Sequence, residues 1–256
     1  MSPATDLQLI AIPGIPDVQP GDDVGRMLLD ALDRAGLALL DGDVLAVAQK
    51  IVSKAEGRLV DLAGVEPGEH ALKLAAQVNK NPRLVELILR ESDEVSRIRP
   101  GVLIVRHRLG FTSANAGIDH SNVGHGSEER VLLLPVDPDA SAVRIRETVA
   151  VVCGVDVGVV ITDSHGRPFR LGTVGVAIGV AGLPALWDRR GESDRYGYRL
   201  RHTDVGVADE IAAAAGLLMG QAAEGLPAVL LRGLRLPSTD GRAADLVRPK
   251  ELDLYR

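Results

Sequence analysis

The sequence Val157-Gly158-Val159-Val160-Ile161-Thr162-Asp163-Ser164-His165-Gly166-Arg167 contains the clearest indication of the fold. Its first six residues are mostly β-branched and apolar, which is typical of a strand that is buried on both faces of a sheet. The residues after them are polar and include a glycine, so we expect a loop there. A buried strand would fix Asp163 while the loop lets a ligand, such as a metal ion, approach its carboxylate. The alternative interpretation is that Asp163 caps a helix or a turn.

Strand-like and helical patterns alternate outward from this stretch. Strands are expected at 7–12, 44–49, 102–106, 131–134, 173–181 and 228–234, and helices at 68–78, 83–92, 140–153 and 205–219. A further helix should follow Asp22 as its N-cap and run to about Ala35, and Asn81-Pro82 is a standard helix start. Gly172, Gly175 and Gly179 lie inside a strand pattern, which favours a bulge or close backbone packing. This order predicts a mixed α/β (α+β) fold.

The composition excludes several classes of protein. The 256 residues are 46% hydrophobic and 25% charged, which is ordinary for a globular protein. The net charge of −6 argues against non-specific nucleic-acid binding, which needs a basic surface. The single cysteine, Cys153, excludes a disulfide framework and a cysteine-based zinc site. With neither a leader pattern nor an apolar run of about 20 residues, we expect no membrane association and a cytoplasmic location.

A second polar segment, residues 113–124, also lies between predicted strands. It contains Asp119, which could bind a hard divalent cation, and Asn122, which could bond to a phosphate or a sugar. The alternative is an ordinary turn rich in Asn and Asp.

Basic residues follow two of the predicted strands. Arg167 and Arg170 can neutralise phosphate or carboxylate oxygens. Lys50 and Lys54 could meet a nucleotide phosphate, although exposed lysines are usually only solvated. His165 has no second histidine at metal-ligand spacing, so it is interpreted as a loop residue.

Small residues end the predicted helix before residue 220. The segment 216–227 contains Gly220 and Gly225, which allow a ligand to approach the backbone closely. A helix C-cap is the alternative. The phosphate-binding pattern G-x-x-x-x-G-K-[ST] is absent from the sequence, which argues against a P-loop nucleotide hydrolase.

A series of short motifs links these segments. In order they are Pro13-Gly14-Ile15-Pro16, Pro20-Gly21-Asp22-Asp23, Asp41-Gly42-Asp43-Val44, Val52-Ser53-Lys54-Ala55-Glu56-Gly57-Arg58, Asn115-Ala116-Gly117-Ile118-Asp119, Leu134-Pro135-Val136-Asp137-Pro138-Asp139, Thr162 to Arg167, Val207-Ala208-Asp209-Glu210-Ile211-Ala212 and Pro227-Ala228-Val229. Their number and order resemble the coenzyme F420-0:L-glutamate ligase family, whose members add glutamate to a deazaflavin coenzyme. The resemblance extends from Ile12 to about Tyr255.

The resemblance implies an F420-0:gamma-glutamyl ligase-like fold of mixed sheets with flanking helices, in an intertwined homodimer. Residues 1–256 would form one functional unit, which can divide into two subdomains around a shared core. The implied substrates are GTP, L-glutamate and coenzyme F420-0. Each active site would hold two divalent cations, Mg²⁺ or Mn²⁺, together with K⁺.

The resemblance also assigns roles to individual residues. The nucleotide would be bound by Ile15, Pro16, Asp17, Val18, Gln49, Lys50, Lys54, Asn122, Met219, Gly220, Gln221, Ala222, Ala223, Glu224, Gly225 and Leu226. The metal ligands would be Asp119, Asp163, Ser164 and Gln221. Asp119, Asp163 and Arg167 would take part in catalysis.

Three sites depart from the family pattern. Gln49-Lys50 stand where small hydroxyl residues are common, and Ser164 stands in place of a usual Thr, which preserves the hydroxyl. Gln221 stands where a Glu is often found. A neutral amide is a weaker Mg²⁺ ligand than a carboxylate, so the second metal site is the less secure of the two.

The implied reaction moves the γ-phosphoryl group of GTP onto a carboxylate, and the glutamate amine then attacks the acyl phosphate. This chemistry needs positioning and charge neutralisation more than a nucleophilic side chain. Two alternatives stay open: a metal-dependent hydrolase of nucleotides or phosphoesters, with Asp119 and Asp163 activating water, and a GTP-binding module without ligation. Some family members continue into a flavin-dependent reductase-like domain, so the chain is expected to be either a stand-alone ligase or the first domain of a longer one.

Overall fold

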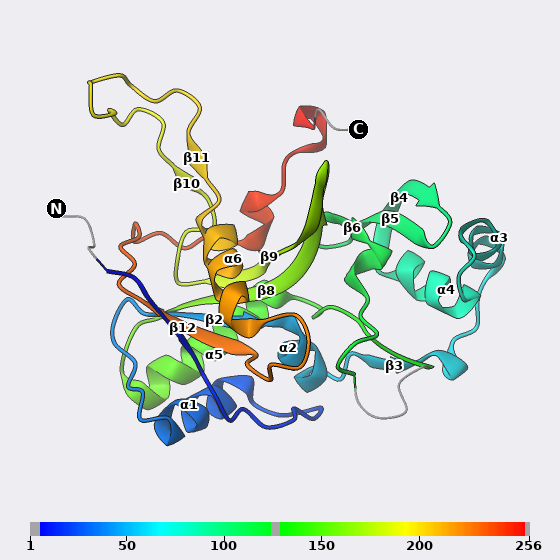
Figure 1. The fold of residues 1–256 in the computed structure, drawn as a ribbon, viewed down its shortest axis with the longest axis horizontal. Coiled ribbons are helices and arrows are strands. Elements are labelled where there is room, and N and C mark those ends of the chain that lie inside the picture. The colour runs from blue at the N-terminus through cyan, green and yellow to red at the C-terminus, as the bar shows by residue number, and fades with distance from the viewer. Residues whose placement is uncertain (1–5, 124–128, 254–256) are drawn as a thin grey trace.

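The computed structural model describes residues 6–123 and 129–253. A five-stranded sheet, in the order β1-β12-β2-β8-β9, forms its centre (Figure 1). The strands are β1 (Gln8–Ala11), β2 (Val44–Ala48), β8 (Gly158–Arg167), β9 (Arg170–Ala181) and β12 (Ala228–Arg232). β2 and β8 are parallel and the other neighbours are antiparallel, so the sheet is mixed, as the sequence predicts.

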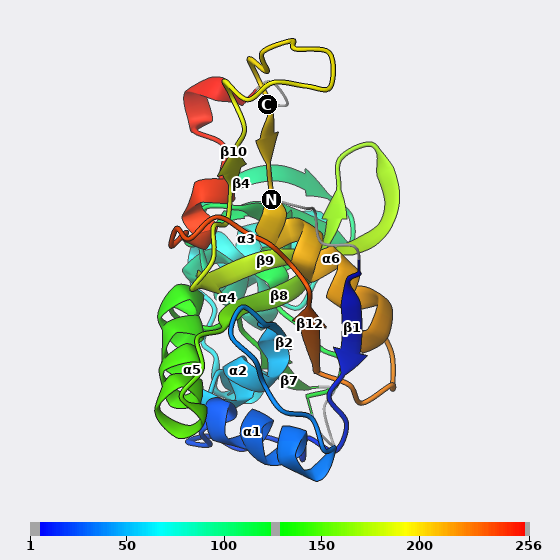
Figure 2. The ribbon, with the colours of Figure 1, turned by 90° about the vertical axis from the view of Figure 1, so that its left-hand side faces the viewer.

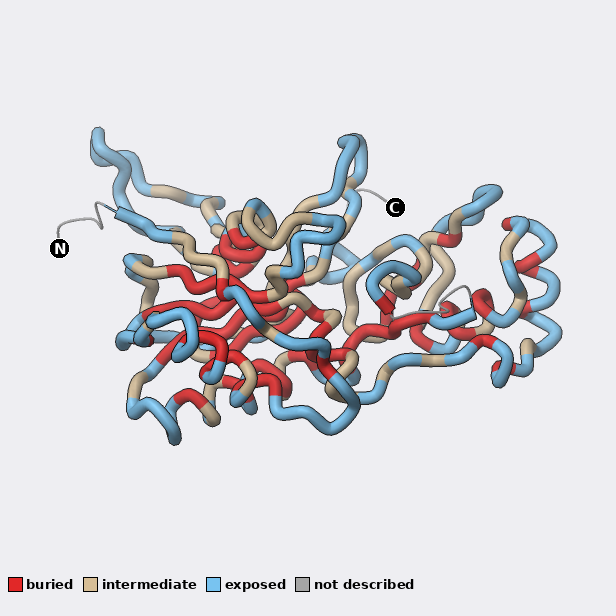
Figure 3. The backbone as a smooth tube through the Cα atoms, turned by 60° about the horizontal axis from the view of Figure 1, so that its bottom comes forward, coloured by how far each residue is buried: buried red, intermediate tan, exposed pale blue. Residues whose placement is uncertain are grey.

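Helices cover both faces of this sheet (Figures 1 and 2). One face carries α1 (Val24–Arg34), α2 (Gln49–Ala55) and α5 (Pro138–Cys153), and the other carries α6 (Val207–Met219). Successive side chains of β2 alternate between the faces: Leu45 and Val47 join the cluster with α1 and α5, whereas Val44 and Ala46 join the cluster with α6. Both faces are therefore dry, which explains the unbroken apolar pattern of the inner strands (Figure 3).

A separate apolar cluster, drawn from residues 62–133, lies beside the central sheet. Its elements are β3 (Leu59–Asp61), η1 (Leu62–Gly64), α3 (Glu69–Val78), α4 (Pro82–Arg90), β4 (Ser92–Arg99), β5 (Val102–His107), β6 (Thr112–Ala114), η2 (Asn115–Gly117) and β7 (Arg130–Leu132). β4, β5 and β6 form one small sheet, and β3 pairs with β7. The expected division into two subdomains stays a prediction.

The remaining elements lie after β9. β10 (Trp187–Asp188) and β11 (Asp204–Val205) pair at the base of a projecting excursion, and η4 (Ala243–Leu246) and η5 (Lys250–Leu252) belong to the C-terminal segment. Within residues 6–123 and 129–253, no helix has the length and apolar character needed to cross a membrane.

The N-caps observed at two helices can be compared with those expected from the sequence. Asn81-Pro82 begins α4 as predicted, because the Asn81 side chain accepts a hydrogen bond from the N–H of Arg83. The expectation for the first helix is wrong by one residue. Asp23 caps α1, whereas Asp22 accepts from the N–H of Gln19 in the preceding turn. Either of two adjacent aspartates could cap the helix as far as the sequence shows, and only the geometry of the turn decides which one does.

The loop expected after Thr162 is also wrong. β8 continues to Arg167, and Asp163 and His165 pair with Val176 and Val174 of β9. Polar residues can extend a strand when a neighbouring strand supplies backbone partners, so the polarity of this segment misleads. Asp163 is therefore held in a paired strand, just after a β-bulge where the register shifts between Ile161 and Thr162.

Glycines in β9 let helices pack close to the sheet. A Cβ atom on Gly175 would lie 2.3 Å from the carbonyl oxygen of Ala212 in α6. A Cβ atom on Gly179 would lie 2.4 Å from the carbonyl oxygen of Pro138 in α5. Any side chain would force the helices outward, which confirms close backbone packing at Gly175 and Gly179. The expectation of close packing is wrong for Gly172, because no heavy atom beyond its chain neighbours lies within 4 Å of its Cβ position and its φ of 81° places it in the left-handed region.

Candidate active site

A cavity of ≈ 410 Å³ lies where β2 ends, between α2 and the segment that follows α6. Every residue that the resemblance assigns to GTP lines it. Its volume falls in the range of small-molecule sites. The residues of the lining that sequence reasoning missed are Ala48, Ile51, Thr162, Gly175, Ala212, Gly216 and Pro227. Most of these are small or apolar, and no sequence signal separates them from core residues.

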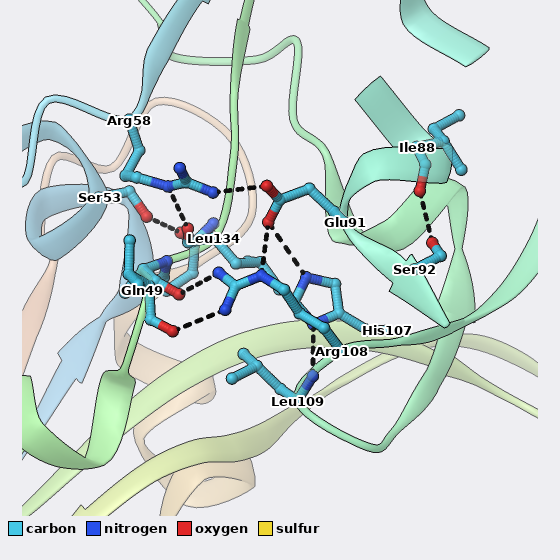
Figure 4. A network of polar contacts seen from close by, with 12 residues as sticks. Gln49, Ser53, Arg58, Ile88, Glu91, Ser92, His107, Arg108, Leu109 and Leu134 are labelled. Carbon is cyan, nitrogen blue, oxygen red and sulfur yellow. Dashed lines mark hydrogen bonds and ion pairs between the residues drawn. The ribbon is translucent and has the colours of Figure 1, made fainter. Parts of the chain in front are cut away.

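Helix α2 supplies one wall of the cavity. β2 ends at Ala48, one residue earlier than expected, and the helix begins at once, so Lys50 lies in its first turn and Lys54 in its last. Gln49 is buried and joins two partners: its Oε1 accepts from the hydroxyl of Ser53 at 2.8 Å (Figure 4), and its Nε2 donates to Oδ2 of Asp119 at 2.8 Å. The residue that departs from the family pattern thus orients a candidate metal ligand.

Lys50 adds a positive charge to the same carboxylate. Its Nζ lies 3.5 Å from Oδ2 of Asp119 and donates to the hydroxyl of Ser121 at 2.8 Å. Burial raises the pKa of Asp119 to about 6, the charge of Lys50 opposes this rise, and the charge of Asp163 adds to it. The two carboxylates are therefore close enough to repel each other.

An unusual backbone turn places Asp119. Asn115, Ala116 and Gly117 have φ values of 52°, 55° and 65°, so three successive residues are left-handed. Such conformations are costly for alanine and concentrate at functional sites. Asp119 then pairs with Leu132, donating its N–H at 3.0 Å and accepting at 2.9 Å. The segment thus contains a turn, at residues 115–117, that positions the carboxylate of Asp119. The binding of a cation by Asp119 stays a prediction.

On β8, Asp163 and His165 point to the same face. Nε2 of His165 lies 2.9 Å from Oδ2 of Asp163, and the ring packs against Phe111 at 4.8 Å between centroids. The interpretation of His165 as a loop residue is wrong, for the same reason as the predicted loop itself. Spacing alone could not reveal this contact, because it depends on the two-residue period of a strand.

The segment after α6 closes the cavity. Nε2 of Gln221 donates to the hydroxyl of Ser164 at 3.0 Å, and Nδ2 of Asn122 donates to the carbonyl of Ala222 at 3.1 Å. Gly220 ends α6 with φ 70°, so it is a helix C-cap that also lines the cavity.

Some assigned positions lie elsewhere. Arg167 is at the far end of β8, pairs with Arg170 and does not line the cavity. Its catalytic role stays a prediction. Gly124, which ends the second polar segment, and Tyr255, which ends the resemblance, lie outside the described residues.

The donor atoms near the cavity suit hard cations. Asp119 and Asp163 offer carboxylate oxygens, Ser164 a hydroxyl and Gln221 an amide oxygen, which are the ligand types of Mg²⁺ and Mn²⁺. A cation between the two carboxylates would relieve their mutual repulsion. In the part of the chain that the structure describes, no group of three or more His, Cys, Asp or Glu side chains forms a metal cage. Any divalent ion would need oxygens from water or a ligand as well.

Fold and site together define an α/β protein whose ligand cavity is lined by two lysines and by Asp163. Asp119 does not line the cavity, but it contacts the lining residues Gln49 and Lys50. The model of the F420-0:Gamma-glutamyl ligase family matches residues 14–233 of the chain. The coenzyme F420:L-glutamate ligase of Methanothermobacter thermautotrophicus is 48% identical over 98% of this chain and 99% of its own length. The enzymes of the same name from Methanopyrus kandleri and Haloarcula marismortui are 45% and 43% identical, each over 98% of this chain and over 98% and 96% of their own lengths. The chain belongs to the F420-0:gamma-glutamyl ligase family.

Proposed function

We propose that this protein is a GTP-dependent ligase that adds L-glutamate to coenzyme F420-0 in coenzyme F420 biosynthesis. The observation that carries the proposal is the single cavity in which all the expected nucleotide contacts meet beside Asp163, with Asp119 held at its edge. The family and the relatives named coenzyme F420:L-glutamate ligase supply the reaction class.

The chemistry follows from the weakness of a carboxylate as an acyl donor. A carboxylate oxygen of F420-0 attacks the γ-phosphorus of GTP, the bond to the β-phosphate oxygen breaks, and GDP leaves. The amine of glutamate then attacks the acyl carbon, an amide forms, and phosphate leaves with the loss of one amine proton. Lys50 and Lys54 are placed to bind phosphate oxygens, which would hold the nucleotide in line for the transfer.

The proposal includes two divalent cations, Mg²⁺ or Mn²⁺, and K⁺. Asp119 and Asp163 would hold the first divalent ion, and Ser164 and Gln221 would contribute to the second. Such ions neutralise the charge of the triphosphate during phosphoryl transfer.

Mass spectrometry of F420-0 incubated with the protein, GTP, Mn²⁺ and L-glutamate tests the function. We expect a product heavier by one glutamyl residue, formed only when all three additions are present. Phosphate release that is independent of glutamate would favour the hydrolase alternative. Unchanged F420-0 together with intact GTP would favour a binding module.

We also propose that the protein is a homodimer. The tip of the β8–β9 hairpin exposes Phe169 and Leu171, which are 92% and 98% accessible. Two large apolar side chains on a projecting hairpin are a common feature of surfaces that pair with another chain.

A further inference from the structure

A second cavity, of ≈ 320 Å³, lies along the free edge of β9. One wall is the turn between β5 and β6, and another is the C-terminal segment that contains η4, which runs beside β9 (Figure 1). The polar side chains of the lining are Thr112, His165, Asp209, Arg248 and Asp253. The resemblance assigned none of these residues to the nucleotide or to a metal.

This cavity and the proposed nucleotide cavity meet at β8. His165 lines the second cavity, and its Nε2 lies 2.9 Å from Oδ2 of Asp163, which lines the first. The two cavities therefore lie next to each other at this hydrogen-bonded pair. A molecule in the second cavity would be close to any group activated beside Asp163.

Asp209 supplies a half-buried carboxylate to the second cavity. Its Oδ1 accepts from the N–H of Ala177 at 2.8 Å. Within the described residues, it makes no ion pair with a lysine or an arginine. Burial raises the pKa of Asp209, and the hydrogen bond from Ala177 and the charge of His165 oppose the rise. A half-buried carboxylate that forms no ion pair with a lysine or an arginine favours a cationic ligand.

The other groups in the cavity suit a small molecule that carries both charges. Arg248 offers a guanidinium, which recognises carboxylates through two hydrogen bonds. The carboxylate of Asp253 and the hydroxyl of Thr112 also line the space. Between these polar groups the walls are apolar: Phe111, Val176, Ile178, Leu246 and Val247. A short aliphatic chain between an ammonium and a carboxylate matches this arrangement.

We infer that this second cavity binds the α-amino acid co-substrate, with the ammonium group facing Asp209 and a carboxylate facing Arg248. Its role in the reaction rests on the proposed function, because that reaction needs a place for L-glutamate next to the nucleotide site. Binding of the amino acid itself does not depend on the ligase activity.

The test compares Asp209→Asn with Asp139→Asn. Asparagine can still accept the backbone hydrogen bond, so the first change removes mainly the charge. Asp139 is a matched control because its Oδ1 also accepts from backbone N–H groups, those of Val180 at 2.8 Å and of Ala243 at 3.1 Å, and burial also raises its pKa. Ala243 lines the second cavity but Asp139 does not, so the control also reports any effect of disturbing the cavity wall. Calorimetric titration of each protein with L-glutamate gives the affinity, steady-state kinetics give KM for each substrate, and thermal melting reports folding.

We expect Asp209→Asn to weaken L-glutamate binding and raise its KM by roughly 10- to 100-fold, with KM for GTP and F420-0 unchanged. Asp139→Asn should leave all three KM values unchanged. Unaltered glutamate affinity in Asp209→Asn, or an effect on KM for F420-0 instead, would overturn the inference. If the wild-type protein binds glutamate through Asp209 but forms no ligated product, the proposed function fails while the cavity assignment stands.

Discussion

Nε2 of His165 lies 2.9 Å from Oδ2 of Asp163, and the two side chains are only 11% and 10% exposed. The pair exists because both residues lie on β8 two positions apart, so the pleat turns them to the same face. The contact fixes one oxygen of Asp163 and leaves the other for a ligand. It also connects the proposed nucleotide site to the second cavity, which is the proposed binding site of L-glutamate.

Lys54→Ala should weaken GTP binding without unfolding the protein. Lys54 lines the nucleotide cavity from α2, and a hydrogen bond from a lysine to phosphate is worth about 1.5–3 kcal/mol. The expected loss of affinity in calorimetry is roughly 10- to 100-fold. Lys73→Ala is the control, since Lys73 pairs with Glu69 on the exposed side of α3. Equal GTP affinities for both variants would remove Lys54 from the site.

Glu91→Gln should lower the free energy of unfolding, because it removes the ion pairs of Glu91 with Arg58 and Arg108. Burial alone would raise the pKa of Glu91, but the neighbouring imidazole of His107 and the guanidinium groups of Arg58 and Arg108 lower it to about 2 (Figure 4). The folded-state pKa lies below the ordinary value of 4.5, so this stabilisation is complete above about pH 4.5 and disappears as the pH falls towards 2. At pH 7 the change should cost roughly 3 kcal/mol, with the difference from wild type shrinking at pH 3.

Urea unfolding at the two pH values measures this difference. Glu69→Gln serves as control, because its exposed pair with Lys73 should contribute less than about 1 kcal/mol. A Glu91→Gln midpoint equal to that of wild type at pH 7 would show that the ion-pair cluster adds nothing.

The sequence predicts the inner strands well and the site only in part. The apolar run of β8 has one physical solution, a strand dry on both faces, so its position could be read from residues 157–162. The polar continuation from Asp163 to Arg167 forms a strand because β9 pairs with it. The local composition of these residues does not indicate that β9 is their partner. The same limit applies to Asp119, whose orientation depends on Gln49, seventy positions earlier in the chain.

Gln221→Glu should strengthen divalent cation binding in the presence of GTP. Gln221 now offers a neutral amide beside Ser164, and a carboxylate in its place would add a negative charge to the proposed second metal site. The Mn²⁺ concentration that gives half-maximal activity should fall by roughly 10-fold. Gln221→Ala should shift it the opposite way. An identical Mn²⁺ dependence in all three proteins would exclude position 221 from metal binding.

The proposed dimer predicts a molar mass twice the 27.1 kDa of one chain in light scattering. Leu171→Ser should weaken the association, because Leu171 is 98% exposed at the hairpin tip and would bury its side chain only in a partner. Leu217→Ser is a matched control on α6, where the leucine is 83% exposed. A wild-type mass near 27.1 kDa in dilute solution contradicts the dimer.

Asp119→Asn and Asp163→Asn should separate a metal-binding role from a structural one. Burial raises the pKa of Asp119 to about 6, with the charge of Asp163 acting in the same direction, so the ionised pair destabilises the metal-free fold at neutral pH. Because the folded-state pKa of Asp119 is above its ordinary value of 3.8, stability falls as the pH rises from about 4 to 6. Replacing either carboxylate removes the repulsion, so the metal-free variants should melt no lower than wild type.

The turnover of both variants should fall, although their melting temperatures do not. If the two carboxylates hold the cation that neutralises the triphosphate, turnover should fall by several orders of magnitude in either variant. Added Mn²⁺ with GTP should raise the melting temperature of the wild-type protein and have little effect on the variants, since a ligand stabilises only the state that binds it. A structural role for Asp163, through its contact with His165, predicts the reverse: a lower melting temperature with turnover largely kept. Melting and turnover measured with and without Mn²⁺ distinguish the two roles, and near-normal turnover in one variant removes that residue from the metal site.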